Sequence, residues 1–162
     1  MWFFKWAIFF SLFTFINCVY AQNCIPLKVV DGDTFHFERD SELIKVRVAG
    51  FDAPERGQPY SRVATAKLRE LTQAGADCEC FKKDKYKRSV CRVRVGGLNV
   101  ATLMLQHGLG CIDPRFSGED SMKDQRAHAE ALIAAQAGRR GMWADDEPVC
   151  GKEYRDAKRA KR

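Results

Sequence analysis

The segment Val29–Phe35 carries two carboxylates, one on each side of a glycine. Because Asp31 and Asp33 are two residues apart, an extended backbone directs both carboxylates to the same side. Oxygens placed in this way suit a hard cation such as calcium. The segment also has a purely structural interpretation, because Asp-Gly between apolar runs is typical of a hairpin, in which Gly32 permits a tight turn.

A second acidic segment, Asp52-Ala53-Pro54-Glu55, follows about twenty residues later. Pro54 fixes its own φ and favours an extended conformation at Ala53, which would hold the Ala53 carbonyl and the Asp52 and Glu55 carboxylates in fixed positions. Alone, this segment could be an Asx-type turn with exposed acids. Together, the two segments offer the carboxylate and carbonyl oxygens that calcium prefers, although EF-hand spacing is absent.

Two arginines complete a set of groups suited to cleaving phosphodiesters. Such hydrolysis needs a positioned water and cations that stabilise the charge developing on phosphate oxygens. The planar guanidinium of Arg47 or Arg88 matches a phosphate bidentately and stays protonated. The alternative for Arg47 is an ordinary solvated strand residue, since it alternates with the apolar Val46 and Val48.

Hydrophobic periodicity predicts the elements that must position these residues. Strands are expected over residues 25–30, 34–38, 43–49, 78–81 and 89–95, and helices over residues 61–74, 99–107 and 121–137. Three strands, a helix, two strands and two helices predict an α+β fold, namely a five-stranded OB-type Greek-key β-barrel with three α-helices. Small barrels of this kind commonly bind oligonucleotides on one face.

The two ends of the chain differ from its middle. Residues 1–21 have the build of a cleaved signal peptide, with an apolar run behind Lys5 and a small-x-small site ending at Ala21; an uncleaved membrane anchor is the alternative. We expect one domain over residues 22–150 and a mobile basic tail over 151–162. We therefore expect a secreted or periplasmic protein, monomeric and without stable membrane association.

Cysteine usage and charge agree with export. Of seven cysteines, Cys18 lies in the leader and six remain, an even set that predicts disulfides in an exported chain. No C-x-x-C pair is present, so a zinc site is disfavoured. Without Lys5, the remaining chain has 26 basic and 21 acidic side chains, a net charge of +5 that would attract polyanions such as nucleic acids, anionic lipids or acidic glycans.

Three segments in register resemble the staphylococcal nuclease (thermonuclease) family: residues 29–34, 46–55 and 84–88. The likeness extends through residues 105–109 and the helix that ends at Gly141-Met142-Trp143, and covers roughly Ile25 to Trp143. The resemblance implies a metal-dependent hydrolase of the micrococcal nuclease type that uses Ca²⁺ and cuts both DNA and RNA. It also implies cleavage of the bond between phosphorus and the 5′ oxygen, which leaves 3′-phosphates.

The resemblance also assigns a role to each position that matches the family motif. The direct calcium ligands would be Asp33, Asp52 and the backbone carbonyl of Ala53, with Asp31 in the outer shell through water. Glu55 would position or deprotonate the attacking water, while Arg47 and Arg88 clamp the phosphate.

The sequence departs from the family pattern at the substrate-facing segments. Lys87 stands where the family usually has glycine before its second arginine, which leaves the loop geometry at Arg88 open. Pro114 and Phe116 stand where tyrosines usually face the substrate. Phe116 can stack on a base but cannot hydrogen-bond a phosphate. Lys85 and Tyr86 remain as candidate phosphate and base contacts, or as an exposed loop.

If the family fold holds, it also suggests disulfide partners. Cys78 or Cys80 would reach Cys91 across a strand pair, and Cys111 would pair with Cys150 to hold the C-terminal end. The cysteines are not part of the family's core pattern.

Two other functions are compatible with parts of the sequence. A non-catalytic OB-fold nucleic-acid-binding module would explain the basic charge, but it has no need for the acids and arginines together. A disulfide-stabilised exported toxin or inhibitor would explain the cysteines, but leaves both acidic segments unexplained.

Overall fold

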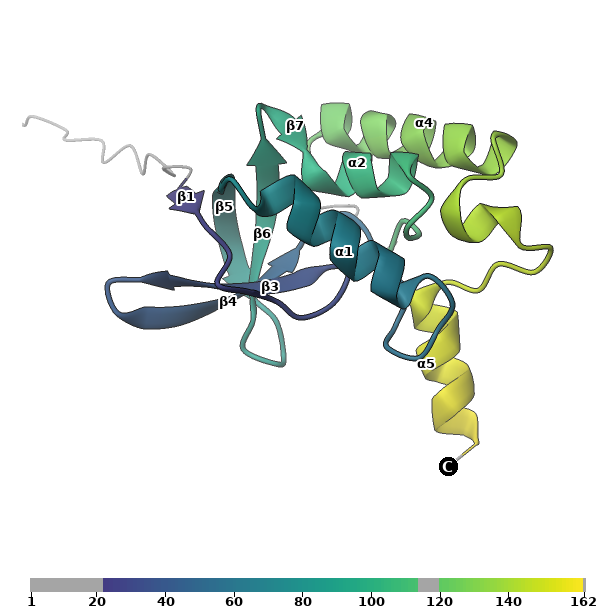
Figure 1. Cartoon of the computed structure of the whole chain (residues 1–162), viewed down its shortest axis with the longest axis horizontal. Helices are drawn as coiled ribbons and strands as arrows, with labels where there is room; N and C mark the ends of the chain where they lie inside the picture. The colour runs from purple at the N-terminus through teal and green to yellow at the C-terminus, as the bar shows by residue number, and fades with distance from the viewer. Residues whose placement is uncertain (1–21, 114–119, 162) are drawn as a thin grey trace, which may run out of the picture.

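A strongly curled, mixed β-sheet forms the centre of the protein (Figure 1). The computed structural model describes residues 22–113 and 120–161. Within these residues the strands lie side by side in the order β1 (Gln22–Cys24), β5 (Ala76–Lys83), β6 (Ser89–Val95), β4 (Glu42–Val48), β3 (Thr34–Arg39) and β2 (Lys28–Val29), and β7 (Leu98–Asn99) also pairs with β6. The pairing of β4 with β6 is parallel, and it joins the β2–β3–β4 meander to the β5–β6 hairpin.

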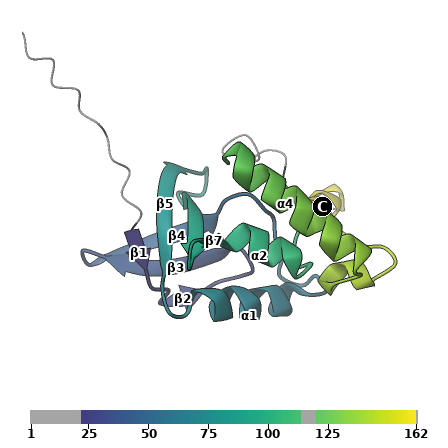
Figure 2. The ribbon, with the colours of Figure 1, turned by 90° about the horizontal axis from the view of Figure 1, so that it is seen from above.

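The helices lie along one side and at one end of the sheet. They are α1 (Ser61–Thr72), α2 (Val100–Gln106), α4 (Met122–Ala137) and α5 (Gly151–Ala160), with a 3₁₀ turn, η1 (Gly141–Ala144). Figure 2 shows α2 between α1 and α4. Side-chain caps define two of the starts: Asn99 accepts a hydrogen bond from the Ala101 N–H (3.0 Å), and Ser121 accepts one from the Asp124 N–H (3.1 Å).

The hydrophobic core fills the space between the curled sheet and the helices. Its largest fully buried side chains are Phe35, Phe51, Leu68, Met104 and Leu105. The alternation predicted for the third strand puts Val46 and Val48 in this core, which leaves the residue between them free to face the other side of the sheet. The core therefore fixes the direction in which the polar side chains on β3 and β4 point.

The predicted α+β barrel fold is confirmed. The five expected strands correspond to β2 through β6, and the three expected helices to α1, α2 and α4. Strand β2 is shorter than expected because Pro26 has no N–H to donate to the ladder, and pairing begins at the Leu27 N–H, which donates to the His36 carbonyl (2.8 Å). The short strands β1 and β7 were not predicted. Neither was α5, which lies in the segment expected to be a mobile tail.

Six cysteines pair as three disulfides: Cys24–Cys78, Cys80–Cys91 and Cys111–Cys150. The suggested pairing of Cys91 with a cysteine of β5 is confirmed, and its partner is Cys80 rather than Cys78. The suggested pairing of Cys111 with Cys150 is confirmed as well. Three disulfides in so small a chain indicate an oxidising compartment. Among residues 22–113 and 120–161, none of the helices is long and apolar enough to cross a membrane.

The disulfides close loops of different length, which predicts a rank order of stabilisation. Cys24–Cys78 spans 54 residues and Cys80–Cys91 spans 11. Replacing both cysteines of a pair with alanine should lower the free energy of unfolding by about 4 kcal/mol for the first pair and about 3 kcal/mol for the second, because the longer loop restricts the unfolded chain more. Urea unfolding of the two double variants and the parent tests this; a larger loss from Cys80–Cys91 would contradict it.

Candidate nuclease site

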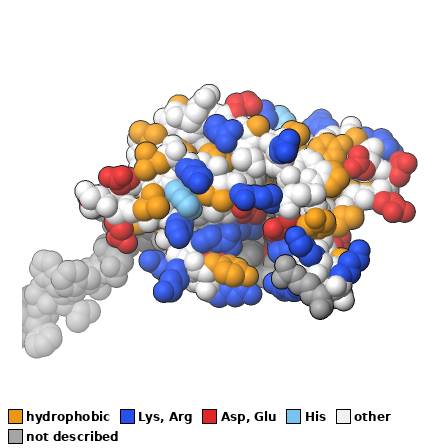
Figure 3. Space-filling model, turned by 60° about the horizontal axis from the view of Figure 1, so that its bottom comes forward, with side chains coloured by type: hydrophobic (Ala, Val, Ile, Leu, Met, Phe, Trp, Pro, Cys, Tyr) orange, Lys and Arg blue, Asp and Glu red, His pale blue; other side chains and the backbone are white. Residues whose placement is uncertain are grey.

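A polar pocket opens between the β5–β6 loop, the two acidic segments and α5. It has a volume of about 580 Å³, and its lining includes Asp31, Asp33, Arg47, Asp52, Ala53, Glu55, Lys82, Lys83, Asp84, Lys85, Tyr86, Arg88, Lys152 and Arg155. Figure 3 shows Lys and Arg side chains gathered around a hollow on this face. The pocket therefore brings together every site residue predicted from the sequence, except Phe116, which lies outside the described residues with Pro114.

The first acidic segment is the expected hairpin connection between β2 and β3. The Asp33 N–H donates to Asp31 Oδ1 (3.1 Å), and the Thr34 hydroxyl donates to Asp33 Oδ1 (2.9 Å). Gly32 is required by close packing rather than by the turn: a Cβ there would stand 2.7 Å from the methyl groups of both Ala53 and Ala64. The hairpin thus packs directly on the second acidic segment.

The second acidic segment is held on two sides. The Ala53 N–H donates to Asp33 Oδ2 (3.2 Å), which links the two segments. On its other side, Asp52 and Cys111 exchange backbone hydrogen bonds of 2.8 and 3.0 Å. The two acidic segments therefore face one another, and Asp33 and Asp52 are both nearly inaccessible to solvent.

Arg47 lies between the two segments and is only 5% exposed, so it is not a solvated strand residue. Its Nη2 lies 3.2 Å from Asp33 Oδ2 and 3.4 Å from Asp52 Oδ1, and it donates to the Phe51 carbonyl (2.8 Å). Nη1 donates to the Val48 carbonyl. A single guanidinium thus contacts both carboxylates that were predicted to bind a metal.

Arg88 is oriented by Asp84, a role that the sequence analysis did not assign. Asp84 Oδ2 accepts from Arg88 Nε (2.8 Å) and Nη2 (2.7 Å), and Oδ1 accepts the N–H groups of Tyr86 and Arg88 (both 2.9 Å). Burial acts to raise the pKa of Asp84, but the hydrogen bonds from Arg88 and Tyr86 outweigh it and hold the pKa below its usual value. Arg88 Nη1 also donates to the Thr34 hydroxyl (3.1 Å), which directs it toward the first acidic segment.

Lys87, which stands where the family usually has glycine, adopts a backbone conformation that favours glycine. Its φ is +63°, in the left-handed region that glycine occupies without strain. The turn closes nevertheless, because the Lys87 N–H donates to the Asp84 carbonyl (2.9 Å). The loop therefore keeps the geometry that a glycine would give, and Arg88 still reaches the pocket.

The candidate substrate contacts stand on the rim of the pocket. Tyr86 is 60% exposed, and its ring lies under two cations, Lys85 Nζ (5.1 Å from the ring centre) and Arg88 Cζ (5.5 Å). An exposed ring beside cationic groups is the arrangement on which bases stack in single-strand binding proteins.

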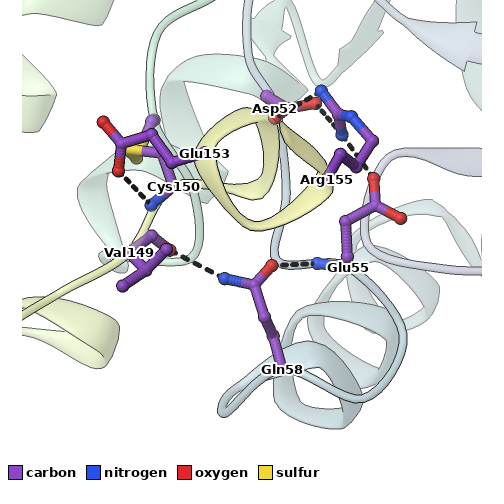
Figure 4. The surroundings of a disulfide bond; sticks show 8 residues. Asp52, Glu55, Gln58, Val149, Cys150, Glu153 and Arg155 are labelled. Atoms are coloured by element: carbon purple, nitrogen blue, oxygen red, sulfur yellow. Dashed lines mark hydrogen bonds and ion pairs between the residues drawn. A yellow bond between two sulfur atoms is a disulfide. The ribbon is translucent and has the colours of Figure 1, made fainter. Parts of the chain in front are cut away.

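Helix α5 supplies a residue that sequence reasoning missed, Arg155. Figure 4 shows its guanidinium between two carboxylates of the second acidic segment. Nη1 lies 3.0 Å from Asp52 Oδ1, Nη2 lies 3.1 Å from Asp52 Oδ2, and Nη1 also donates to Glu55 Oε1. The one signal in the sequence that could have placed α5 here was the suggested pairing of Cys150 with Cys111.

Burial and crowding of the carboxylates alter their protonation. Burial, reinforced by the adjacent Asp33 carboxylate, raises the pKa of Asp31 to about 6. Burial also raises the pKa of Asp52, even though hydrogen bonding to Arg155 opposes the shift. In both groups burial is the largest cause of the raised pKa and the Asp33 carboxylate adds to it, so a cation bound beside them would favour their ionised forms.

The donor types of this site fit calcium, although no preformed cage is present. In the described part of the chain, no three His, Cys, Asp or Glu side chains form a ready-made metal cluster. What the pocket offers is a pair of carboxylates, Asp33 and Asp52, that already share a positively charged neighbour in Arg47, together with the backbone carbonyl of Ala53. Hard oxygen donors of this kind are the ligands that calcium prefers.

A small curled barrel with an acidic, arginine-lined pocket and a basic rim defines a class of phosphate-handling protein, and comparisons identify the family. The family described as "Staphylococcal nuclease homologue" matches residues 45–145. An "Uncharacterized endonuclease" of Haemophilus influenzae is 28% identical over 148 residues, which cover 89% of this chain and 80% of the relative. One of the same name from Escherichia coli O157:H7 is 27% identical over 126 residues, 76% of this chain and 78% of the relative.

A plant protein is similar over a smaller share of its own length. The "Probable staphylococcal-like nuclease CAN1" of Oryza sativa subsp. japonica is 31% identical over 117 residues, 71% of this chain and 33% of the relative. The chain belongs to the staphylococcal nuclease family.

The raised pKa of Asp31 predicts a pH dependence of stability. A carboxyl that holds its proton more tightly when folded stabilises the fold below its unfolded pKa of 3.8, and this contribution is lost as pH rises through about 6. In chelator, the free energy of unfolding should therefore fall between these values, and Asp31→Asn should reduce the fall. Urea unfolding across this range measures it. Asp40→Asn, at an exposed turn, is the control; equal slopes in both variants would contradict the prediction.

Proposed function

We propose that this protein is a calcium-dependent phosphodiesterase that hydrolyses DNA and RNA and leaves 3′-phosphates. The observation that carries the proposal is the convergence in one pocket of two acidic segments and two arginines, from four separate parts of the chain. Membership of the staphylococcal nuclease family, with relatives named as endonucleases, supports a nuclease activity in general. The calcium requirement and the bond cleaved are the finer parts of the proposal.

The arginines and Glu55 divide the chemical work between them. Arg88, held by Asp84, would bind the phosphate that enters the pocket, and Arg47 would stabilise the charge that develops on its oxygens. The Glu55 side chain is 37% exposed, so water can reach its carboxylate. Glu55 would then act on that water as a general base or as an orienting group. Water then adds to phosphorus and the bond from phosphorus to the 5′ oxygen breaks. The proton that the water loses, to Glu55 or to solvent, is balanced by a proton that the departing 5′ oxygen takes up from solvent.

Asp33, Asp52 and the Ala53 carbonyl would hold the calcium ion, with Asp31 acting through water. When bound, the ion would polarise a phosphoryl oxygen. Asp33 is also tied to the Ala53 N–H, so it can keep both acidic segments in place whether or not an ion is present.

The rim of the pocket suits a nucleic-acid strand of either sugar type. Lys82, Lys83 and Lys85 line it together with Tyr86, and these residues would contact phosphates and a base face. Such contacts do not read the 2′-hydroxyl, so they would not distinguish RNA from DNA.

Export completes the proposal. The signal peptide proposed for residues 1–21 lies outside the described residues, but the three disulfides support function in an oxidising compartment.

One experiment tests the proposed activity. The purified oxidised protein is incubated with single-stranded and double-stranded DNA and with RNA, in calcium, in magnesium and in chelator. We expect cleavage in calcium and none in chelator, with 3′-phosphate ends on the products. Substrate that stays intact in calcium while it still binds the protein would instead favour the non-catalytic binding module.

The role of Glu55 predicts a kinetic effect with no loss of structure. Glu55→Gln should lower kcat by roughly 10²–10⁴-fold, because the amide cannot accept a proton from water. Glu38→Gln is the matched control, since Glu38 is exposed on β3 and does not line the pocket. Initial rates on DNA and circular dichroism spectra measure both. A loss of rate that matches a loss of folded structure would show that Glu55 is structural.

A further inference from the structure

Arg155 occupies both oxygens of a carboxylate that the proposed function assigns to calcium. Its two terminal nitrogens lie 3.0 and 3.1 Å from the two oxygens of Asp52, in a forked arrangement, and Glu55 accepts a further hydrogen bond. Paired, charge-assisted hydrogen bonds of this kind are among the strongest that side chains make. Asp52 is nearly inaccessible to solvent, so little water competes with Arg155 for it.

The first residue of α5 also lies against oxygen atoms of the second acidic segment. Gly151 is buried, and a Cβ there would stand 2.7 Å from Asp52 Oδ2 and even closer to the Ala53 carbonyl oxygen. Only glycine lets the helix approach so closely. The start of α5 therefore lies directly on the oxygen atoms that the proposed function assigns to the metal.

Two connections hold α5 in this place and a cap closes its first turn, as Figure 4 shows in part. The Cys111–Cys150 disulfide joins its N-terminus to the residue that pairs with Asp52 through the backbone. Gln58 Nε2 donates to the Val149 carbonyl (2.8 Å), and Glu153 caps the helix by accepting from the Cys150 N–H (3.2 Å). The position of Arg155 thus follows from covalent and hydrogen-bonded anchors rather than from its charge alone.

We propose that Arg155 sets the cation affinity of the site by acting as an internal counter-cation, which must withdraw from Asp52 and Glu55 before calcium binds. The inference rests on the proposed function, because it takes Asp52 as a metal ligand. A guanidinium and a calcium ion are both positive, and they compete for the same oxygens. The affinity for calcium is therefore reduced by the fraction of molecules in which Arg155 is in place.

The test measures calcium binding directly rather than activity. Isothermal titration of calcium into the metal-free, oxidised protein gives the Kd for the parent, Arg155→Gln and Arg159→Gln. We expect Arg155→Gln to bind calcium at least about tenfold more tightly, since the competing contact is gone. Arg159, one turn further along α5, is 65% exposed and pairs only weakly with Asp156 (3.7 Å). Its replacement changes the net charge equally and should alter Kd less than about threefold.

A second measurement uses the parent protein alone, so it does not depend on whether a variant folds. Hydrogen exchange of the parent protein, with and without calcium, should show faster exchange of the α5 amides when calcium is bound, because Arg155 is released. Unchanged or slower exchange in α5 would overturn the inference.

The outcomes separate the two proposals. Equal or weaker calcium binding by Arg155→Gln, with calcium-dependent cleavage intact, overturns the role of Arg155 alone. If neither the parent nor Arg155→Gln binds calcium, the calcium site of the proposed function fails, and this inference fails with it.

Discussion

The contact on which the pocket depends is the one between the Asp33 carboxylate and the second acidic segment. One oxygen of Asp33 accepts the Ala53 N–H and forms an ion pair with Arg47, so a single atom joins the β2–β3 hairpin, β4 and the loop that follows β4. Burying carboxylates is costly unless cations and N–H groups surround them. Arg47 supplies that balance from within the strand, and the hydrophobic side chains on either side of it hold the strand in register.

The sheet explains why residues from distant parts of the chain meet at this point. The parallel pairing of β4 with β6 aligns Val46 with Ser89, directly after Arg88. The antiparallel pairing of β3 with β4 aligns Thr34 with Arg47. Arg47 and Arg88 therefore lie beside the first acidic segment largely because of strand register, and the side chains then complete contacts that the backbone has already brought within reach.

Most of this arrangement could be predicted from the sequence, because it depends on local patterns. Alternating apolar residues located the strands, an Asn and a Ser located two helix starts, and the acids and arginines matched a family motif. Lys87 shows the limit of such reasoning: the sequence revealed a residue that is not glycine, but only the backbone shows that it adopts the same left-handed conformation. Asp84 lies in the family-like segment of residues 84–88, yet its contacts with Arg88 depend on how the loop closes.

Helix α5 could not be predicted because nothing local requires it. Its segment is rich in charged residues and has few apolar ones, the composition typical of a solvated tail. It is ordered by contacts that are distant in sequence, namely a disulfide to Cys111 and ion pairs to Asp52 and Glu55. Pairing of buried carboxylates with a distant arginine has no periodicity and leaves no pattern to read.

The Cys111–Cys150 bond would also determine how strongly Arg155 competes with calcium for the carboxylate oxygens of Asp52 and Glu55. A group attached to its own target acts at a fixed effective concentration, in the millimolar range for short connections, whatever the concentration of the protein. Here the attachment is one residue before the helix begins, and Arg155 lies little more than one turn further on. Dilution of the protein would therefore not release it. Only the free calcium concentration around the molecule would, so each molecule would carry its own threshold for that ion.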